Sequence, residues 1–436
     1  MSIKEVLRQT ALLERPPAPP TILGPCVRGN GIDSLTGSRR TRLEGLARKA
    51  ISEGRVAKFV PASGAATRLF SSGHKPDRYL DALLGKDLLS LARRPKGLIP
   101  FHRVGQGTRT AFEEHLWEGV VFSSRQGILK THFTVPRNSL SDFRRLGKIC
   151  ADQIERRTGK RVRLAFSVQD PATDTLAWEE KKGWVRNEGG GLLFRPGGHG
   201  ALLKNLEATG GDIVLIKNID NVPRAPLQAA GNRWRMALVG RLIEVQTEAH
   251  AWIARLLPKT TGEESVRGAE QFISHVLGVT ISARSLSQRK GHAIEIADRP
   301  WRVCGMVPNV GEPGGGPFWV MEGPLPSRQI LEASQLGKSQ KRLLKQSTHF
   351  NPVDMVVGLK NWQGRPFDLT RFSDPSQGIV TEKHFEGRAI RTLEHPGLWN
   401  GGMAHWNTLF IEVPAAIFHP VKTITDLLRP GHRGQY

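Results

Sequence analysis

The strongest constraint on the fold lies in residues 196–222. There the small-residue loop PGGHG opens the apolar helical stretch ALLKNL, and the strand-like run DIVLIK follows and ends in NIDN. A short apolar run bounded by turn residues is typical of a strand buried on both faces of a parallel sheet. Ligands of open α/β proteins bind at the carboxyl ends of such strands. The segment therefore predicts an α/β fold with Asn218 and Asp220 at its ligand-binding edge.

Strands and helices continue to alternate on both sides of this segment. VAKFV (56–60) predicts a short buried strand, and residues 161–168 predict another. Helices are expected at three places: 34–55, 139–157 and 233–257. Alternating strands and helices predict a mostly parallel, Rossmann-like sheet flanked by helices. From about Trp301 short strands and Gly/Pro turns predominate, which predicts a β-rich part over residues 300–436.

Length and composition limit the class of protein. The chain has 436 residues, of which 39% are hydrophobic and 24% charged, as is typical of a globular protein. We expect a helical, Pro-rich leader over 1–45 and one elaborated domain over 46–436, because no linker-like segment interrupts the latter. No apolar run is long enough for a transmembrane helix, and residues 1–30 lack the pattern of a signal peptide. Three widely spaced cysteines without a CxxC pair favour a reducing cytoplasm over a zinc site or a disulfide framework.

The formal net charge of +23 points to an anionic partner. A basic surface attracts phosphate groups without sequence specificity. The charge is spread along the chain, aromatic residues make up only 7%, and no helix-turn-helix, zinc-finger or RNP-type signature accompanies it. We therefore expect an anionic small substrate and no specific nucleic acid. A non-catalytic, basic nucleotide- or RNA-binding protein is the alternative.

The turn after the first buried strand is suited to binding phosphates. PASGAATRL places the backbone N–H groups of Ala62, Ser63 and Gly64 before a helix start, followed by Thr67 and Arg68. The GK[ST] ending of a Walker loop is missing, which disfavours a P-loop kinase or ATPase. A tight turn packed against the sheet is the other interpretation of this segment.

Lys96 and the strand end NIDN supply charges that phosphate chemistry needs. Lys96 follows Pro95 at the head of an apolar run, where its ammonium would neutralise charge developing on a phosphate under attack; the alternative is an ordinary surface lysine. Asp220 is the best metal candidate, because Mg²⁺ is typically held by one or two carboxylates together with substrate phosphates. Asn218 and Asn221 either bind sugar hydroxyls or close the turn.

Two further turns carry polar side chains. Gln169 ends a predicted strand, so its amide is placed to contact the edge of a base, whereas Asp170 and Asp174 behind it are interpreted as capping residues. Glu312 lies in the glycine cluster GEPGGGPFWV, where backbone can approach a ligand closely and the carboxylate would bind vicinal hydroxyls; a hairpin turn is the alternative. The histidines, including His199, are interpreted as structural, and the GxSxG and HExxH signatures are missing.

Six segments of the chain together resemble a bacterial protein family catalogued as a domain of unknown function. They lie within residues 45–436 and read KFVPASGAATRLF, FSVQDPATDT, LLFRPGGHGALLKNL, IKNIDNV, RVCGMVPNVGEPGGGPFWV and GLWNGGMAHWNTLFIEVPAAIFHPVKTITDLLRP. The same segments resemble an outlying version of the UDP-sugar pyrophosphorylases. That resemblance implies a GT-A-like nucleotidyltransferase fold. Members of that family often continue into a C-terminal β-helix domain, which we do not expect here.

The resemblance to the pyrophosphorylases also implies roles for single segments. SGAATR resembles their Gly-rich GTR loop, although alanines replace some of its glycines. PGGHG resembles their base-binding loop, which implies that Gly197, Gly198 and Gly200 face the base. NIDN resembles their N-x-D-N strand end, which implies that Asp220 is a Mg²⁺ ligand.

Two lysine segments complete this resemblance. PKGLIP resembles the family's activating lysine segment and FHPVKTITDLL its late phosphate-contacting segment, which implies catalytic roles for Lys96 and Lys422 beside Arg68. The implied reaction transfers a nucleoside monophosphate, expected to be UMP from UTP, to a sugar-1-phosphate with release of pyrophosphate. A GT-A-like glycosyltransferase that consumes a nucleotide sugar is the alternative, which the two lysine segments and the missing DxD run disfavour.

Overall fold

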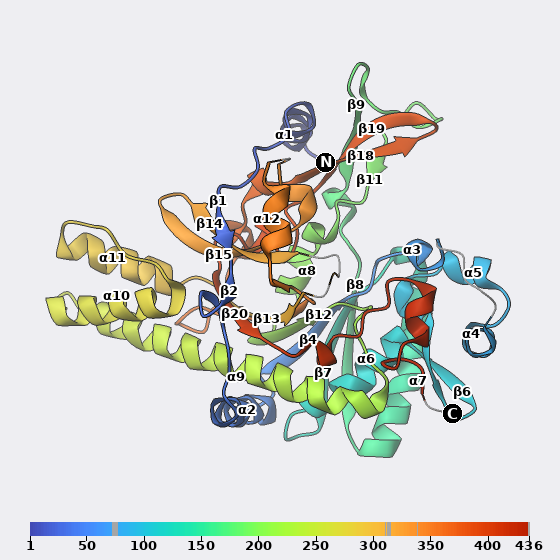
Figure 1. The fold of residues 1–436 in the computed structure, drawn as a ribbon, viewed down its shortest axis with the longest axis horizontal. Coiled ribbons are helices and arrows are strands. Elements are labelled where there is room, and N and C mark those ends of the chain that lie inside the picture. The colour runs from blue at the N-terminus through green and yellow to red at the C-terminus, as the bar shows by residue number, and fades with distance from the viewer. Residues whose placement is uncertain (72–76, 310, 312–314, 338, 435–436) are drawn as a thin grey trace.

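A large, mostly parallel sheet forms the centre of the computed structural model, which describes residues 1–71, 77–309, 311, 315–337 and 339–434 (Figure 1). In spatial order its strands are β2 (Val27–Arg28), β3 (Gly31–Asp33), β20 (Asn407–Glu412), β13 (Trp301–Pro308), β17 (Asp354–Gly358), β12 (Ile213–Lys217), β4 (Val56–Pro61), β7 (Ile128–Thr134) and β8 (Arg161–Ser167). β17 runs antiparallel to both β12 and β13, whereas the neighbouring pairs on either side are parallel. The predicted α/β class with a mostly parallel sheet is confirmed.

The apolar run in DIVLIK forms the buried centre of this sheet. All residues of β12 are buried, and Ile213–Ile216 pair in parallel with Val56–Phe59 of β4. Its other neighbour is β17, which pairs with it in the antiparallel direction. Burial on both faces explains why the run shows no alternation of apolar and polar residues.

Helices cover one face of the sheet in two groups. α2 (Gly37–Ser52) and α9 (Ala225–Leu256) pack over β12, β17 and β13, and both lie along the lower side of Figure 1. The hairpin of α10 (Glu263–Leu277) and α11 (Leu286–Ala297) extends this group at the left. α6 (Ala111–Gly119) and α7 (Leu140–Thr158) share a second core with β4 and β7. Within the described residues, no helix has the length and apolar character that crossing a membrane requires.

The predicted helix at 233–257 begins earlier than expected, at Ala225. The first turn contains Pro226, whose missing N–H is harmless there and whose fixed φ favours a helix start. The first turns of α9 contain Gly231 and several polar residues, because this part of the helix faces other polar groups. The apolar periodicity that predicts a helix is therefore missing there. A Cβ at Gly231 would lie 3.0 Å from the Arg235 guanidinium.

The C-terminal part is rich in antiparallel strands. β14 (Gly316–Glu322) and β15 (Leu325–Leu331) form a hairpin that β1 (Ile22–Pro25) extends. β18 (Ile379–Phe385) and β19 (Arg388–Glu394) form a second hairpin, which joins β9 (Thr175–Glu179), β10 (Gly183–Trp184) and β11 (Phe194–Arg195). The residues assigned to the leader contribute β1, β2, β3 and helix α1 (Ile3–Glu14), which packs on β9 and β19.

One edge of the large sheet gathers the polar strand ends. Because β4, β7, β8 and β12 run parallel, their carboxyl ends meet at the same edge. The segments that follow these four strands are 62–64, 135–137, 168–169 and 218–220. The fold therefore brings together side chains that lie far apart in the sequence.

Candidate active site

A cavity of about 840 Å³ opens at this edge of the sheet. Eight residues predicted from the sequence line it: Ser63, Gly64, Thr67, Lys96, Gln169, Gly198, Asn218 and Asp220. The strand ends contribute part of the lining, and the segments that carry Lys96, Gly198 and Trp399 contribute another part. A cavity of this size at the carboxyl edge of an α/β sheet is a typical place for a ligand.

Asp220 is the electrostatic centre of the cavity. Its Oδ2 accepts a hydrogen bond from Lys96 Nζ at 3.3 Å and another from Lys422 Nζ at 3.2 Å. The exposed fractions of the side chains are 8% for Asp220, 14% for Lys96 and 43% for Lys422. Two ammonium groups share one carboxylate, so these three side chains together carry a net positive charge that would attract a phosphate.

Backbone contacts bring the three charged segments together. Lys96 N donates to Gly64 O at 3.0 Å, so PKGLIP lies beside SGAATR. Val421 N donates to Asp220 O at 2.9 Å, and Lys96 Nζ donates to Val421 O at 3.2 Å. The tail that carries Lys422 is therefore fastened to both NIDN and the lysine turn.

The PGGHG loop packs tightly against the turn before β9 and against the chain beyond β19. A Cβ at Gly197 would lie 2.4 Å from Thr173 O, and one at Gly200 would lie 2.1 Å from Pro396 O. Gly198 has a φ of +74°, which favours glycine, and it lines the cavity. Close backbone packing thus accounts for the small residues at Gly197 and Gly200, and their contact with a base remains a prediction.

Of the two aspartates after β8, one has the expected capping role and the other does not. Asp170 caps the turn Pro171–Thr173 by accepting a hydrogen bond from Ala172 N at 2.9 Å. Asp174 lines the cavity and accepts a hydrogen bond from Gln169 Nε2 at 3.4 Å, so the expected capping role of Asp174 is wrong. Burial raises the pKa of Asp174 above its ordinary value. Pro171 at the first position of the turn was the sequence signal that identifies Asp170 as the cap.

Two aromatic residues of the cavity were not assigned a ligand role from the sequence. His199 and Trp399 stack with ring centroids 4.0 Å apart and planes 18° apart, and both line the cavity. Burial lowers the pKa of His199 to about 4, so the ring is neutral at physiological pH. The indole Nε1 of Trp399 donates to Glu332 Oε1 at 3.3 Å. Trp399 lies in the segment GLWNGGMAHWN, but a single tryptophan in a sequence does not indicate which residues it will contact in the fold.

The residues that line the cavity do not include Ala62, Gly197, Gly200 or Lys422. Ala62 is fully buried behind the loop. Arg68 belongs to the short helix α3 (Thr67–Phe70), and its side chain lies outside the described part of the structure. Glu312 lies outside the described residues altogether. The proposed contacts of Arg68 and Glu312 therefore remain predictions.

Asp220 would provide a carboxylate for a Mg²⁺ ion. Among the described residues, no group of three or more His, Cys, Asp or Glu side chains could hold a metal. Mg²⁺ commonly uses one or two carboxylates, with phosphate oxygens and water completing the octahedron. Asp220, with the Asn218 amide beside it in the cavity, fits that mode of binding.

Comparison with known proteins gives a family and a fold. The profile of the family described as "Domain of unknown function (DUF4301)" matches residues 1–78 and 71–433. A comparison with curated proteins finds no match. The structure is similar to that of UDP-N-acetylglucosamine pyrophosphorylase from Trypanosoma brucei in complex with inhibitor, with a TM-score of 0.53 and 15% identity. The match covers 98% of this chain and 74% of that chain.

Two mutants of UDP-glucose pyrophosphorylase from Leishmania major are similar to the same extent. Their TM-scores are 0.51 and 0.50, their identities 13% and 14%, and the coverage is again 98% of this chain and 74% of those chains. Similarity at such low identity shows a shared fold. What the chain does at its own cavity must be argued from its own residues.

Proposed function

We propose that this chain, which belongs to the family described as "Domain of unknown function (DUF4301)", is a sugar-1-phosphate nucleotidyltransferase. It would transfer a nucleoside monophosphate, UMP in the first instance, from the triphosphate to a sugar-1-phosphate and release pyrophosphate. The observation that carries the proposal is the convergence of Lys96 and Lys422 on Asp220, which lines the cavity together with Lys96. The fold shared with pyrophosphorylases supports it by analogy.

The chemistry is a single in-line displacement. An oxygen of the sugar-1-phosphate forms a bond to the α-phosphorus, and the bond from that phosphorus to the bridging oxygen of the β-phosphate breaks. Pyrophosphate leaves with the electron pair of that bond. Little covalent work falls to the protein, so positioning and neutralisation of charge supply the rate.

Each charged residue at the cavity has a task in this displacement. Lys96 and Lys422 both donate to the Asp220 carboxylate, which lines the cavity, so their charges would act on phosphate oxygens that enter it. The backbone at Ser63 and Gly64 lines the same cavity and is suited to cradling the leaving phosphates. Asp220 would hold Mg²⁺, which when bound offsets the charge of the phosphates.

A screen for pyrophosphate release tests the proposal. The purified chain is incubated with Mg²⁺, each of UTP, CTP, GTP and ATP, and a panel of sugar-1-phosphates. We expect pyrophosphate only when both a triphosphate and a sugar-1-phosphate are present. No release with any combination would overturn the proposal. Release of a nucleoside diphosphate from a nucleotide sugar with an acceptor would instead identify a glycosyltransferase.

Lys96→Ala tests the catalytic lysine within the same assay. Loss of one such charge should lower turnover on the order of 10²-fold. Lys181→Ala is the matched control, because Lys181 is exposed in the loop between β9 and β10. We expect the control to retain the turnover of the unmodified chain. Equal turnover of the two variants would remove Lys96 from the mechanism.

A further inference from the structure

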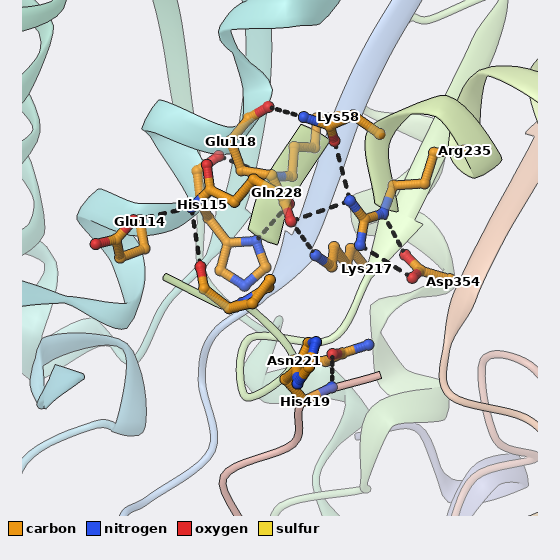
Figure 2. A network of polar contacts seen from close by, with 12 residues as sticks. Lys58, Glu114, His115, Glu118, Lys217, Asn221, Gln228, Arg235, Asp354 and His419 are labelled. Atoms are coloured by element: carbon orange, nitrogen blue, oxygen red, sulfur yellow. Dashed lines mark hydrogen bonds and ion pairs between the residues drawn. The ribbon is translucent and has the colours of Figure 1, made fainter. Parts of the chain in front are cut away.

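A cluster of buried charged side chains lies behind the strand end that carries Asp220 (Figure 2). It consists of Lys58 on β4, Glu118 on α6, Lys217 on β12, Arg235 on α9 and Asp354 on β17, and we call it the buried charge cluster. The exposed fractions of these side chains are at most 2%. None of the five lines the cavity of the candidate site.

Glu118 is the hub of the buried charge cluster. Its carboxylate pairs with Lys58 Nζ at 2.9 Å, with Arg235 Nη1 at 3.1 Å and with Lys217 Nζ. Arg235 also donates from Nε to Asp354 Oδ1 at 2.9 Å. Burial raises the pKa of Glu118, but the three cations together hold it well below its ordinary value. Glu118 is therefore ionised.

Stability alone does not explain such a cluster. Charges removed from water cost free energy that mutual attraction repays only in part, and well-packed apolar residues are often at least as stabilising. The position of the cluster is informative, because Lys217 is the last residue of β12 and directly precedes Asn218. Glu118 on α6 thus holds Lys217, the residue directly before segment 218–220.

A second contact from α6 reaches the strand end itself. His115, one helical turn before Glu118, lies 3.1 Å through Nε2 from the carbonyl oxygen of Ile219. Burial, followed by the charges of Lys58 and Lys217, lowers the pKa of His115 well below its ordinary value. The ring is therefore neutral, and because a carbonyl can only accept, its Nε2–H donates.

The C-terminal tail also holds the strand end. Val421 N donates to Asp220 O at 2.9 Å, and His419 N donates to the side-chain Oδ1 of Asn221 at 3.0 Å (Figure 2). Segment 218–220 thus accepts hydrogen bonds from both α6 and the tail, and we call these contacts the clamp. These contacts fix the Asp220 carboxylate at the position where both lysines donate to it.

We propose that His115 and Glu118 are positioning residues for Asp220. His115 acts through the carbonyl of Ile219, and Glu118 acts through Lys217 at the base of the strand end. Neither residue touches the substrate. The inference rests on the proposed function for its catalytic consequence, whereas the clamp itself is a property of the free protein.

His115→Leu and His115→Gln separate positioning from packing. Leucine keeps a similar volume and removes the donor, whereas glutamine can place an amide N–H near the position of Nε2. A small displacement of a catalytic group costs turnover steeply, so we expect about a 10- to 100-fold lower kcat for His115→Leu. The KM for the triphosphate should change less than about threefold, and His115→Gln should restore most of kcat.

Leu277→Ala controls for loss of stability alone. Leu277 is buried at the end of α10, far in the fold from the strand end, and its truncation leaves a cavity. We expect it to lower Tm and leave the kcat of the folded protein unchanged. If His115→Leu also lowers Tm without lowering kcat, the positioning role is overturned. Glu118→Gln provides a second variant with the same expectation as His115→Leu.

Hydrogen exchange tests the clamp without any turnover. The amides of Asn218, Asn221 and Val421 donate to Val353 O, Asn218 O and Asp220 O, so peptides that contain them report on the segment. We expect exchange at least about 10-fold faster in His115→Leu than in the unmodified chain, and no change there in Leu277→Ala. Unchanged exchange would overturn the inference. Absence of pyrophosphate release with altered exchange would overturn only the proposed function.

Discussion

Asp220 binds two ammonium groups because three stretches of chain meet at the end of β12. Lys96 comes from a turn beside the SGAATR loop, and Lys422 comes from the tail whose backbone is bonded to Asp220. Lys96 lines the cavity and has the smaller exposed fraction, 14% against 43% for Lys422. A charge in a less hydrated place acts more strongly on a phosphate. Lys96→Ala should therefore lower turnover more than Lys422→Ala.

Asp220→Asn tests the carboxylate while preserving its shape. The substitution removes the negative charge that both lysines contact and the oxygen proposed for Mg²⁺, so we expect turnover to fall about 10²-fold or more. Asp212→Asn is the matched control, because Asp212 precedes the same strand at its other end and pairs with Arg55 at 2.6 Å. Steady-state kinetics should show normal turnover for the control. Full activity of Asp220→Asn would remove the metal assignment.

At the scale of elements, helix packing depends on one close approach. α2 crosses α9 at Gly240, where an added Cβ would lie 2.0 Å from the carbonyl oxygen of Leu43. The backbone of Leu43 cannot move aside as a flexible side chain can. A side chain at position 240 would therefore force the two helices apart. This crossing belongs to the core that supports β12 and β17.

Gly240→Ala should destabilise the protein, and a second glycine supplies the control. We expect Gly240→Ala to lower the free energy of unfolding by about 1–3 kcal/mol, as overpacking typically does. Gly45 lies in α2 with nothing within 4 Å of an added Cβ, so Gly45→Ala should stabilise by about 0.5–1 kcal/mol. Urea denaturation measures both. Equal effects of the two substitutions would contradict the close crossing.

The tail that carries Lys422 is fastened by a pair of stacked histidines. His102 Nε2 and His432 Nδ1 lie 2.8 Å apart, and His432 Nε2 donates to His419 O at 3.1 Å. Burial, followed by the charges of His102 and His419, lowers the pKa of His432 from 6.5 to about 3. The unfolded chain therefore takes up this proton before the folded protein does.

Stability should consequently fall as the pH is lowered. The contribution of neutral His432 is complete above pH 6.5 and is lost between pH 6.5 and about 3. At pH 5 the loss amounts to about 2 kcal/mol relative to neutral pH. His432→Gln, which cannot titrate, should show a shallower fall in Tm between pH 7 and pH 5. A parallel fall in both proteins would contradict this role of His432.

At the scale of the whole molecule, the sequence predicted elements better than contacts. β4, β8 and β12 and helix α7 lie where their patterns place them, because each buries a continuous or periodic apolar surface. The start of α9 was missed because its first turns face buried polar groups, so apolar periodicity is lost there. Pairing of β17 against β12 depends on contacts between distant segments, which local patterns do not encode.

The candidate site was predictable in part for the same reason. Strand-end residues such as Asn218 and Asp220 were found because topology sends all parallel strand ends to one edge. Trp399 follows the C-terminal hairpin of β18 and β19, and Asp174 lies in the turn between β8 and β9; the approach of these segments to the cavity leaves no local signal. The buried charge cluster was missed because Lys58 and Lys217 stand in strands that otherwise read as apolar.

Phosphorus NMR of the complete reaction shows which phosphorus atom is attacked and which products form. The chain is mixed with Mg²⁺, UTP and the sugar-1-phosphate that gives most pyrophosphate in the screen, and the products are followed over time. Transfer at the α-phosphorus predicts equal amounts of pyrophosphate and of a nucleoside diphosphate sugar, both abolished in Lys96→Ala. Formation of UDP and inorganic phosphate, or an unchanged spectrum with every sugar-1-phosphate tried, would contradict the account.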